Sequence, residues 1–125
     1  MKFLSTRTHT IIGLVVGAAL VVAPWLFGFA DEGGAAVTVP IAVGIFILIS
    51  ELTTTSAVSL IKLVPMKIHI IVDILTGIFL AVSPWLFMFN DLPANAWVPH
   101  LIVGIMVAGY ALVTNTDDAT NAAKE

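Results

Sequence analysis

Long apolar stretches alternate with short polar breaks along the chain. Four apolar stretches stand out, over residues 10–29, 37–52, 66–89 and 97–113. A helix needs about 20 apolar residues, and at least about 17, to cross the roughly 30 Å core of a bilayer. The first and third stretches meet this length, and the other two lie close to the limit. An open sheet in lipid would leave backbone groups unpaired, and the alternation typical of a membrane barrel is absent. The pattern predicts an all-α bundle of four transmembrane helices.

The second half of the chain repeats the first. A shift of 60 residues places His9 on His69, and it places the segment Pro24-Trp25-Leu26-Phe27 on Pro84-Trp85-Leu86-Phe87. Chance apolar similarity would not reproduce histidine, proline and tryptophan at one fixed offset.

The repeat predicts the domain organisation. We expect a single membrane domain over residues 1–125, with unit one at about 5–55, unit two at about 65–114 and a polar tail at 115–125. Each unit crosses the membrane twice, so both units point the same way. This predicts a pseudo-two-fold axis along the membrane normal.

Prolines mark the expected helix boundaries. Pro40, Pro65 and Pro99 each lie at the start of an apolar run, where a missing N–H costs nothing. Pro24 and Pro84 lie near the far ends of the first and third helices, where a proline removes one helical hydrogen bond and favours a kink.

Composition changes this picture little but excludes several functions. Of 125 residues, 59% are hydrophobic and 10% are charged, whereas a soluble domain has about 25% charged residues. The net charge of −3 and the lack of a basic run argue against nucleic-acid binding. Without cysteine, disulfides, thiolate metal sites and a cysteine nucleophile are excluded. The first apolar run is longer than a signal-peptide core of roughly 7–15 residues, so we expect a retained helix.

Charge and aromatic residues predict the orientation. All basic residues fall on one side of the four crossings: Lys2, Arg7, Lys62, Lys67 and Lys124. The acidic residues of the connecting loops fall on the other side: Asp31, Glu32 and Asp91. The positive-inside rule places both termini in the cytoplasm, and Trp25, Trp85 and Trp97 then form an outer aromatic belt. Residues 53–64 could be an interfacial helix or a plain loop.

The doubled proline-tryptophan corner resembles a known family. The second copy reads Ser83-Pro84-Trp85, preceded by Asp73, and it resembles the SPW-repeat family of small bacterial membrane proteins over roughly residues 5–113. The resemblance implies a four-helix protein of the bacterial inner membrane, and no activity, substrate or cofactor. The first copy departs from it, with Ala23 in place of the serine and Gly13 where Asp73 stands in the second copy. In the second copy, the Ser83 hydroxyl could bond a backbone group that Pro84 frees.

Asp73 is the polar residue that the bilayer penalises most. A charge at mid-bilayer costs about 2.5–3.5 kcal/mol on insertion scales, so such a residue is a functional candidate by default. His69 lies four positions earlier, on the same helix face. The set expected to converge in the half of the bundle near the termini is His9, Glu51, His69, Asp73 and Tyr110. Such a set could be a structural pairing, or it could relay protons or bind a ligand. His100 is expected to be interfacial or capping.

Glycines predict close helix packing. Gly13 and Gly17 form a small-xxx-small motif, and Gly77 and Gly104 lie at repeat-related helical positions. The motif is typical of packing within a bundle, and homodimerisation is the alternative.

Three classes of function remain open. The leading one is a non-enzymatic structural or interaction protein in the bilayer, alone, as a homo-oligomer or with a membrane protein partner, and with no metal or cofactor. The second is a small oligomeric proton-coupled carrier that uses Asp73 and His69. The third is a redox subunit that binds quinone, or haem between His9 and His69.

The convergence hypothesis predicts that Asp73→Asn changes stability or activity more than Asp31→Asn does. The reason is that only Asp73 has apolar neighbours on both sides. Thermal unfolding of both purified variants in detergent measures the difference, and equal effects would count against convergence.

Overall fold

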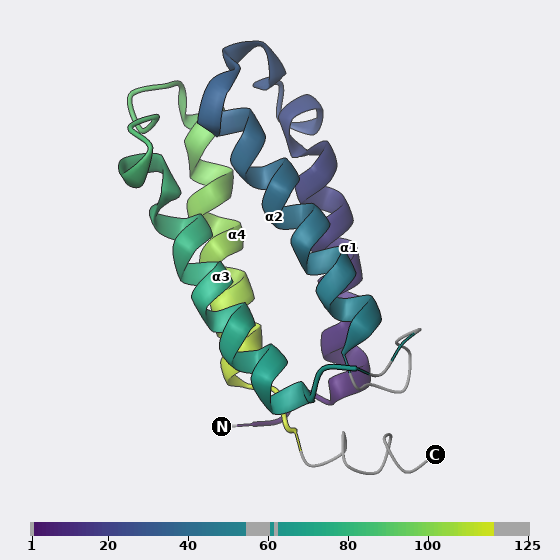
Figure 1. Cartoon of the computed structure of the whole chain (residues 1–125). Helices are drawn as coiled ribbons and strands as arrows, with labels where there is room; N and C mark the ends of the chain where they lie inside the picture. Colours follow the sequence, from purple (N-terminus) through teal and green to yellow (C-terminus); the bar gives the residue numbers. More distant parts are fainter. Residues whose placement is uncertain (1, 55–60, 62, 117–125) are drawn as a thin grey trace.

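Four long helices make up most of the described structure. The computed structural model describes residues 2–54, 61 and 63–116. The helices are α1 (Thr6–Leu26), α2 (Gly34–Thr53), α3 (Met66–Leu86) and α4 (Ala94–Leu112), with a short 3-10 turn η1 (Ala30–Glu32) between α1 and α2 (Figure 1). Each of the four is long and apolar enough to cross a membrane. Within the described ranges the only β-type pairing consists of isolated bridges. The predicted all-α, four-helix fold is confirmed.

The helices are shifted relative to the apolar stretches. α1 begins at Thr6, because the Ser5 side chain accepts a hydrogen bond of 3.1 Å from the Thr8 backbone N–H and caps the helix. It ends at Leu26, and the chain then turns through Gly28 with a φ of 74°. The first turn of α1 therefore contains polar residues, which the apolar stretch that begins at residue 10 does not include.

Of the three prolines expected at the starts of helices, two lie inside helices. Pro65 directly precedes α3, but Pro40 and Pro99 lie inside α2 and α4. Pro40 has no N–H to offer the carbonyl of Ala36, four residues earlier. His100 Nε2 of α4 donates to that carbonyl instead, at 3.0 Å. His100 is 1% exposed and links α4 to α2, so the expectation of an interfacial or capping residue is corrected.

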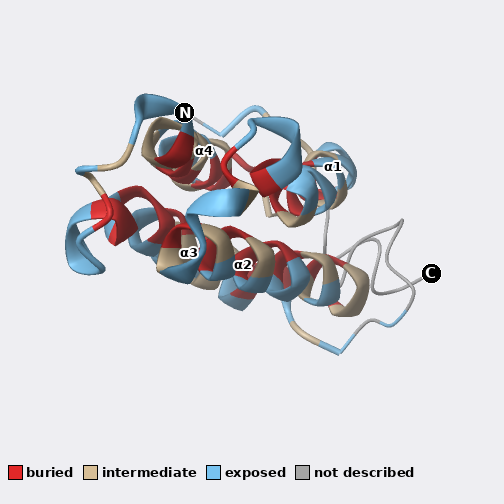
Figure 2. Ribbon diagram, turned by 90° about the horizontal axis from the view of Figure 1, so that it is seen from above, coloured by how far each residue is buried: buried red, intermediate tan, exposed pale blue. Residues whose placement is uncertain are grey.

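The helices pack as two hairpins. α1 lies against α2 and α3 lies against α4, and the hairpins meet mainly along α2–α3 and α1–α4. Seen along the bundle, buried residues face inward and exposed residues face outward (Figure 2). Gly17 and Gly44 face each other within the first hairpin, and Gly77 and Gly104 within the second: a Cβ on either Gly44 or Gly77 would lie 2.6 Å from the opposing glycine carbonyl. These glycines serve packing inside each hairpin.

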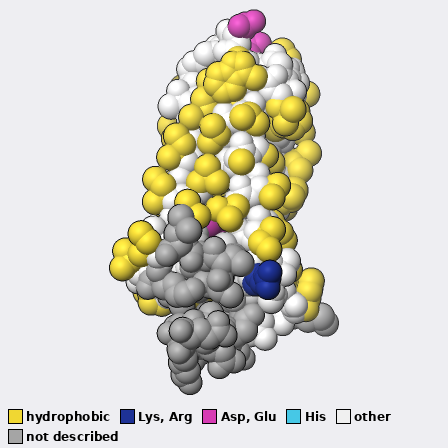
Figure 3. All heavy atoms as spheres, turned by 90° about the vertical axis from the view of Figure 1, so that its right-hand side faces the viewer, with side chains coloured by type: hydrophobic (Ala, Val, Ile, Leu, Met, Phe, Trp, Pro, Cys, Tyr) yellow, Lys and Arg dark blue, Asp and Glu magenta, His cyan; other side chains and the backbone are white. Residues whose placement is uncertain are grey.

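The outer surface is apolar between two polar ends. Apolar side chains cover the flank of the molecule, while acidic residues stand at the end where α1 is joined to α2 and α3 to α4 (Figure 3). The described segments before α1 and after α4 lie at the opposite end, with Arg7 and Lys67 in the first turns of α1 and α3 (Figure 1). Lys62, Lys124 and most of the polar tail lie outside the described residues. The same holds for residues 55–60 and 62 of the segment 53–64 that could form an interfacial helix.

The repeats make matching contacts at the terminal end. Leu4 N donates to Val113 O at 2.9 Å, and Val64 N, 60 positions after Leu4, donates to Thr53 O at 3.0 Å. The matching contacts support the expected parallel arrangement, and the two-fold axis itself stays a prediction.

Candidate functional site

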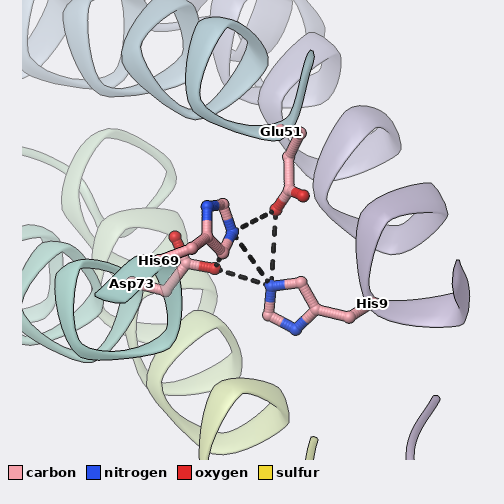
Figure 4. Close-up of side chains that lie close together, drawn as sticks. All are labelled: His9, Glu51, His69 and Asp73. Carbon is pink, nitrogen blue, oxygen red and sulfur yellow. Dashed lines mark hydrogen bonds and ion pairs between the residues drawn. The ribbon is translucent and has the colours of Figure 1, made fainter. Parts of the chain in front are cut away.

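Four ionisable side chains meet inside the bundle near the terminal end. His9 comes from α1, Glu51 from α2, and His69 and Asp73 from α3 (Figure 4). Each is at most 1% exposed. We call these four residues the His–carboxylate centre. It joins both repeat units, because two members come from unit one and two from unit two.

One atom of each residue points to a common point. His9 Nε2 lies 2.8 Å from Asp73 Oδ2 and 3.4 Å from Glu51 Oε1. His69 Nε2 lies 3.0 Å from each of the same two oxygens. The two Nε2 atoms are 3.2 Å apart. All four atoms lie within 4.8 Å of one another.

Threonines fix the orientation of both imidazole rings. His9 Nδ1 lies 2.8 Å from Thr114 Oγ1, and His69 Nδ1 lies 2.7 Å from Thr54 Oγ1 and 2.9 Å from Ser50 Oγ. Each threonine hydroxyl donates its hydrogen to a backbone carbonyl at 2.6 Å, that of Tyr110 for Thr114 and that of Ser50 for Thr54. Each threonine oxygen then accepts from the histidine, and Ser50 Oγ can accept from His69 Nδ1 as well, so we assign a proton to both Nδ1 atoms. In a neutral ring the Nε2 lone pair then points into the centre.

Some buried atoms next to the centre have no partner. Within the described part of the chain, Glu51 Oε2, Asp73 Oδ1 and the Tyr110 hydroxyl are buried without a hydrogen bond. The Tyr110 ring packs edge-on against His9, with 4.8 Å between ring centroids. The structure thus brings four of the five expected residues into one network and places Tyr110 beside it, with its hydroxyl outside the network.

Gly13 makes room for the Glu51 carboxylate. A Cβ at Gly13 would collide with the Glu51 side chain, which crosses from α2 toward α1. By the 60-residue shift, Gly13 corresponds to Asp73 and Glu51 corresponds to Ala111. Each unit therefore supplies one carboxylate, from its second helix in unit one and from its first helix in unit two. Unit one thus has a glycine where unit two has its carboxylate, and unit two has an alanine where unit one has its carboxylate.

The same glycine contact bears on homodimerisation. Gly13 faces Glu51, and Gly17 faces Gly44 and Leu48, all within one hairpin. Both glycines are buried, so this motif already packs against α2 inside the bundle.

The threonine partners are the functional residues that the sequence analysis missed. Thr54 and Thr114 are related by the 60-residue shift, as His9 and His69 are. Each threonine serves the histidine of the other unit. A search for polar residues kept in both units would have found them.

The proline-tryptophan corners lie at the other end of the bundle. Pro24 and Pro84 are in the last turns of α1 and α3, and Trp25 and Trp85 are exposed. The Ser83 hydroxyl donates to the Leu80 carbonyl at 2.7 Å, which is the group that Pro84 leaves without its helical partner. Trp85 and Trp97 stack edge to face at 5.6 Å between centroids. The motif shapes helix ends and presents aromatic rings outward.

The histidine spacing does not suit a haem. Two axial nitrogens on opposite sides of an iron are separated by about 4 Å, with the porphyrin plane between them. Here the two Nε2 atoms are 3.2 Å apart, and both carboxylates contact them. The geometry argues against the expected haem alternative.

Comparison with known proteins settles the family. The SPW repeat domain matches residues 7–114. The chain belongs to the SPW repeat family. Neither a curated protein nor a solved structure matches it. Together with its four spanning helices, the match makes this SPW repeat protein a multi-pass membrane protein. All four residues of the His–carboxylate centre lie inside the matched range.

The contact at Gly13 yields a prediction. Gly13→Ala should lower the thermal midpoint, because the added methyl group must displace the buried Glu51 side chain. Gly109→Ala is the matched control: nothing lies within 4 Å of its Cβ position, so it should gain about 0.5–1 kcal/mol of helix propensity. Circular dichroism melts in one detergent compare the two variants. A Gly13→Ala variant as stable as Gly109→Ala would contradict the placement of Glu51.

Proposed function

We propose that this SPW repeat protein is a non-enzymatic membrane protein in which the His–carboxylate centre locks two helical hairpins together. One observation carries the proposal: the four ionisable side chains are at most 1% exposed and bond one another across the two units. A carrier must expose such groups to water at some stage, and an enzyme needs a cleft at its reactive groups. In this conformation the centre is closed.

Energetics favour a locking role. Removing one partner of a buried ion pair costs about 3–5 kcal/mol, because the other charge is left uncompensated. The pairs of His9 with Asp73 and of His69 with Glu51 each join one unit to the other. A wrong docking of the hairpins would separate these pairs in a low-dielectric interior. The centre therefore specifies one arrangement of the hairpins more than it adds net stability.

We infer further that the protein lies in the bacterial cytoplasmic membrane with both termini in the cytoplasm. The basic residues Lys2, Arg7 and Lys67 precede α1 or lie in the first turns of α1 and α3, while Asp31 and Asp91 lie in the loops at the opposite end. This distribution follows the positive-inside rule. A surface for a protein partner or a second copy would lie on the apolar flank.

The locking role and the carrier alternative predict different effects of Glu51→Gln. We expect the variant to lower the free energy of unfolding by about 3–5 kcal/mol, since the buried partner charge is left uncompensated. The exposed Glu32→Gln is the control and should change little. We also expect vesicles that contain the native protein to leak protons no faster than empty vesicles under a pH gradient, as read by a trapped pH dye. A proton flux that Asp73→Asn abolishes would replace the locking role with the carrier.

The topology can be tested with single cysteines, because the native chain has none. In intact cells, a membrane-impermeant maleimide should label Asp31→Cys, and it should label Lys2→Cys only after the membrane is opened. The converse labelling pattern would reverse the orientation.

A further inference from the structure

The four inward-pointing atoms of the His–carboxylate centre form a constellation that the locking role does not require. Two ligand atoms that each lie about 2.1 Å from an ion are about 3.0 Å apart at a right angle and about 3.4 Å apart at a tetrahedral angle. Five of the six separations among the four atoms fall between 2.8 and 3.4 Å. The sixth, between the two carboxylate oxygens, is within 4.8 Å. The five measured separations match those of neighbouring ligands around one ion.

The hydrogen bonds of the centre are incomplete while both histidine rings are neutral. Thr54 and Thr114 hold the protons of both histidines on Nδ1, so neutral rings present only lone pairs inward. The carboxylate oxygens of Glu51 and Asp73 are also acceptors. With neutral rings the four atoms are all acceptors, so the pairs that make up the lock need either a proton on the Nε2 atoms or a cation between the four atoms. Moreover, Glu51 Oε2 and Asp73 Oδ1 are buried without a partner, which is a second sign that these carboxylates are built for a ligand.

Protonation of both histidines is the competing explanation. Two imidazolium rings would balance the two carboxylates, but they would bring two like charges to nitrogens 3.2 Å apart in a dry interior. One divalent ion balances the same two negative charges and bonds all four atoms. It also needs no proton on either Nε2.

We propose that His9, Glu51, His69 and Asp73 bind one divalent first-row transition-metal ion between the two hairpins. Two imidazole nitrogens favour zinc, iron or a similar ion over magnesium and calcium, which prefer oxygen ligands alone. Thr54 and Thr114 act as positioning residues: each holds the outer nitrogen of one histidine and so aims its Nε2. Four protein ligands in a closed site are typical of a structural ion rather than a catalytic one. The proposal goes beyond the locking role and departs from the sequence-based expectation of no metal.

Zn²⁺ is the probe for the experiment. The full chain, purified in mild detergent and stripped with a chelator, is titrated with ZnCl₂ by calorimetry, and bound metal is counted by mass spectrometry. We expect one Zn²⁺ per chain and a higher thermal midpoint with Zn²⁺ than with the chelator. Co²⁺ in place of Zn²⁺ should show visible absorption bands whose intensity reports the coordination number.

Variants separate the centre from adventitious binding. His69→Gln should weaken Zn²⁺ binding by at least about 100-fold, and Thr114→Val, which keeps all four ligands, by about 10–100-fold. The double variant Asp31→Asn with Glu32→Gln removes exposed carboxylates and should bind as the native chain does. Thr114→Val keeps the test decisive if His69→Gln fails to fold, because its packing change is small and Co²⁺ spectra still report the site.

The outcomes distinguish the metal from the lock. A folded native chain that binds no Zn²⁺, or binds it equally well in Thr114→Val, overturns the metal site. If Glu51→Gln is still destabilising in that case, the locking role stands without a metal. If Zn²⁺ binds with one ion per chain but neither the chelator nor Glu51→Gln changes the thermal midpoint, the metal site stands and the locking role fails.

Discussion

In a bilayer, every polar group of the spanning segments has to be satisfied inside the protein. Lipid offers no hydrogen bonds, and a buried unpaired polar group costs several kcal/mol by transfer estimates, about 4–8 kcal/mol into alkane. This constraint explains where the polar side chains of the SPW repeat protein lie. Ser83 supplies a donor to the carbonyl that Pro84 frees, and His100 does the same for the carbonyl that Pro40 frees. Within the four helices, Glu51 and Asp73 are gathered with His9 and His69 in one buried network.

Both repeat units contribute residues to that network. The histidine and threonine are kept in both units and bond crosswise, His9 with Thr114 and His69 with Thr54. The carboxylates are not kept at equivalent positions, because Glu51 needs the space that Gly13 leaves. The centre is thus a property of the pair of units, and neither hairpin alone contains it.

The two ends of the bundle have different roles. The end with the proline-tryptophan corners shapes loops and carries outward-facing rings, as an interface with headgroups requires. The terminal end holds the His–carboxylate centre, where α1, α2 and α3 meet. The motif that marks the family therefore lies apart from the chemistry that we propose for this chain.

The sequence alone determined the fold class, the four crossings, the repeat and the family, because these follow from local hydrophobicity and from residues counted along the chain. It also named His9, Glu51, His69 and Asp73 as polar residues at one depth. Only the tertiary structure decided that Pro40 and Pro99 lie inside helices, that His100 repairs one of these breaks, and that Tyr110 stays beside the network. It also decided which nitrogen of each histidine faces inward. That choice depends on Thr54, 15 residues from His69, and on Thr114, 105 residues from His9. Depth in a membrane can be read from a helical register, but the direction of a side chain depends on how helices are rotated and packed against one another.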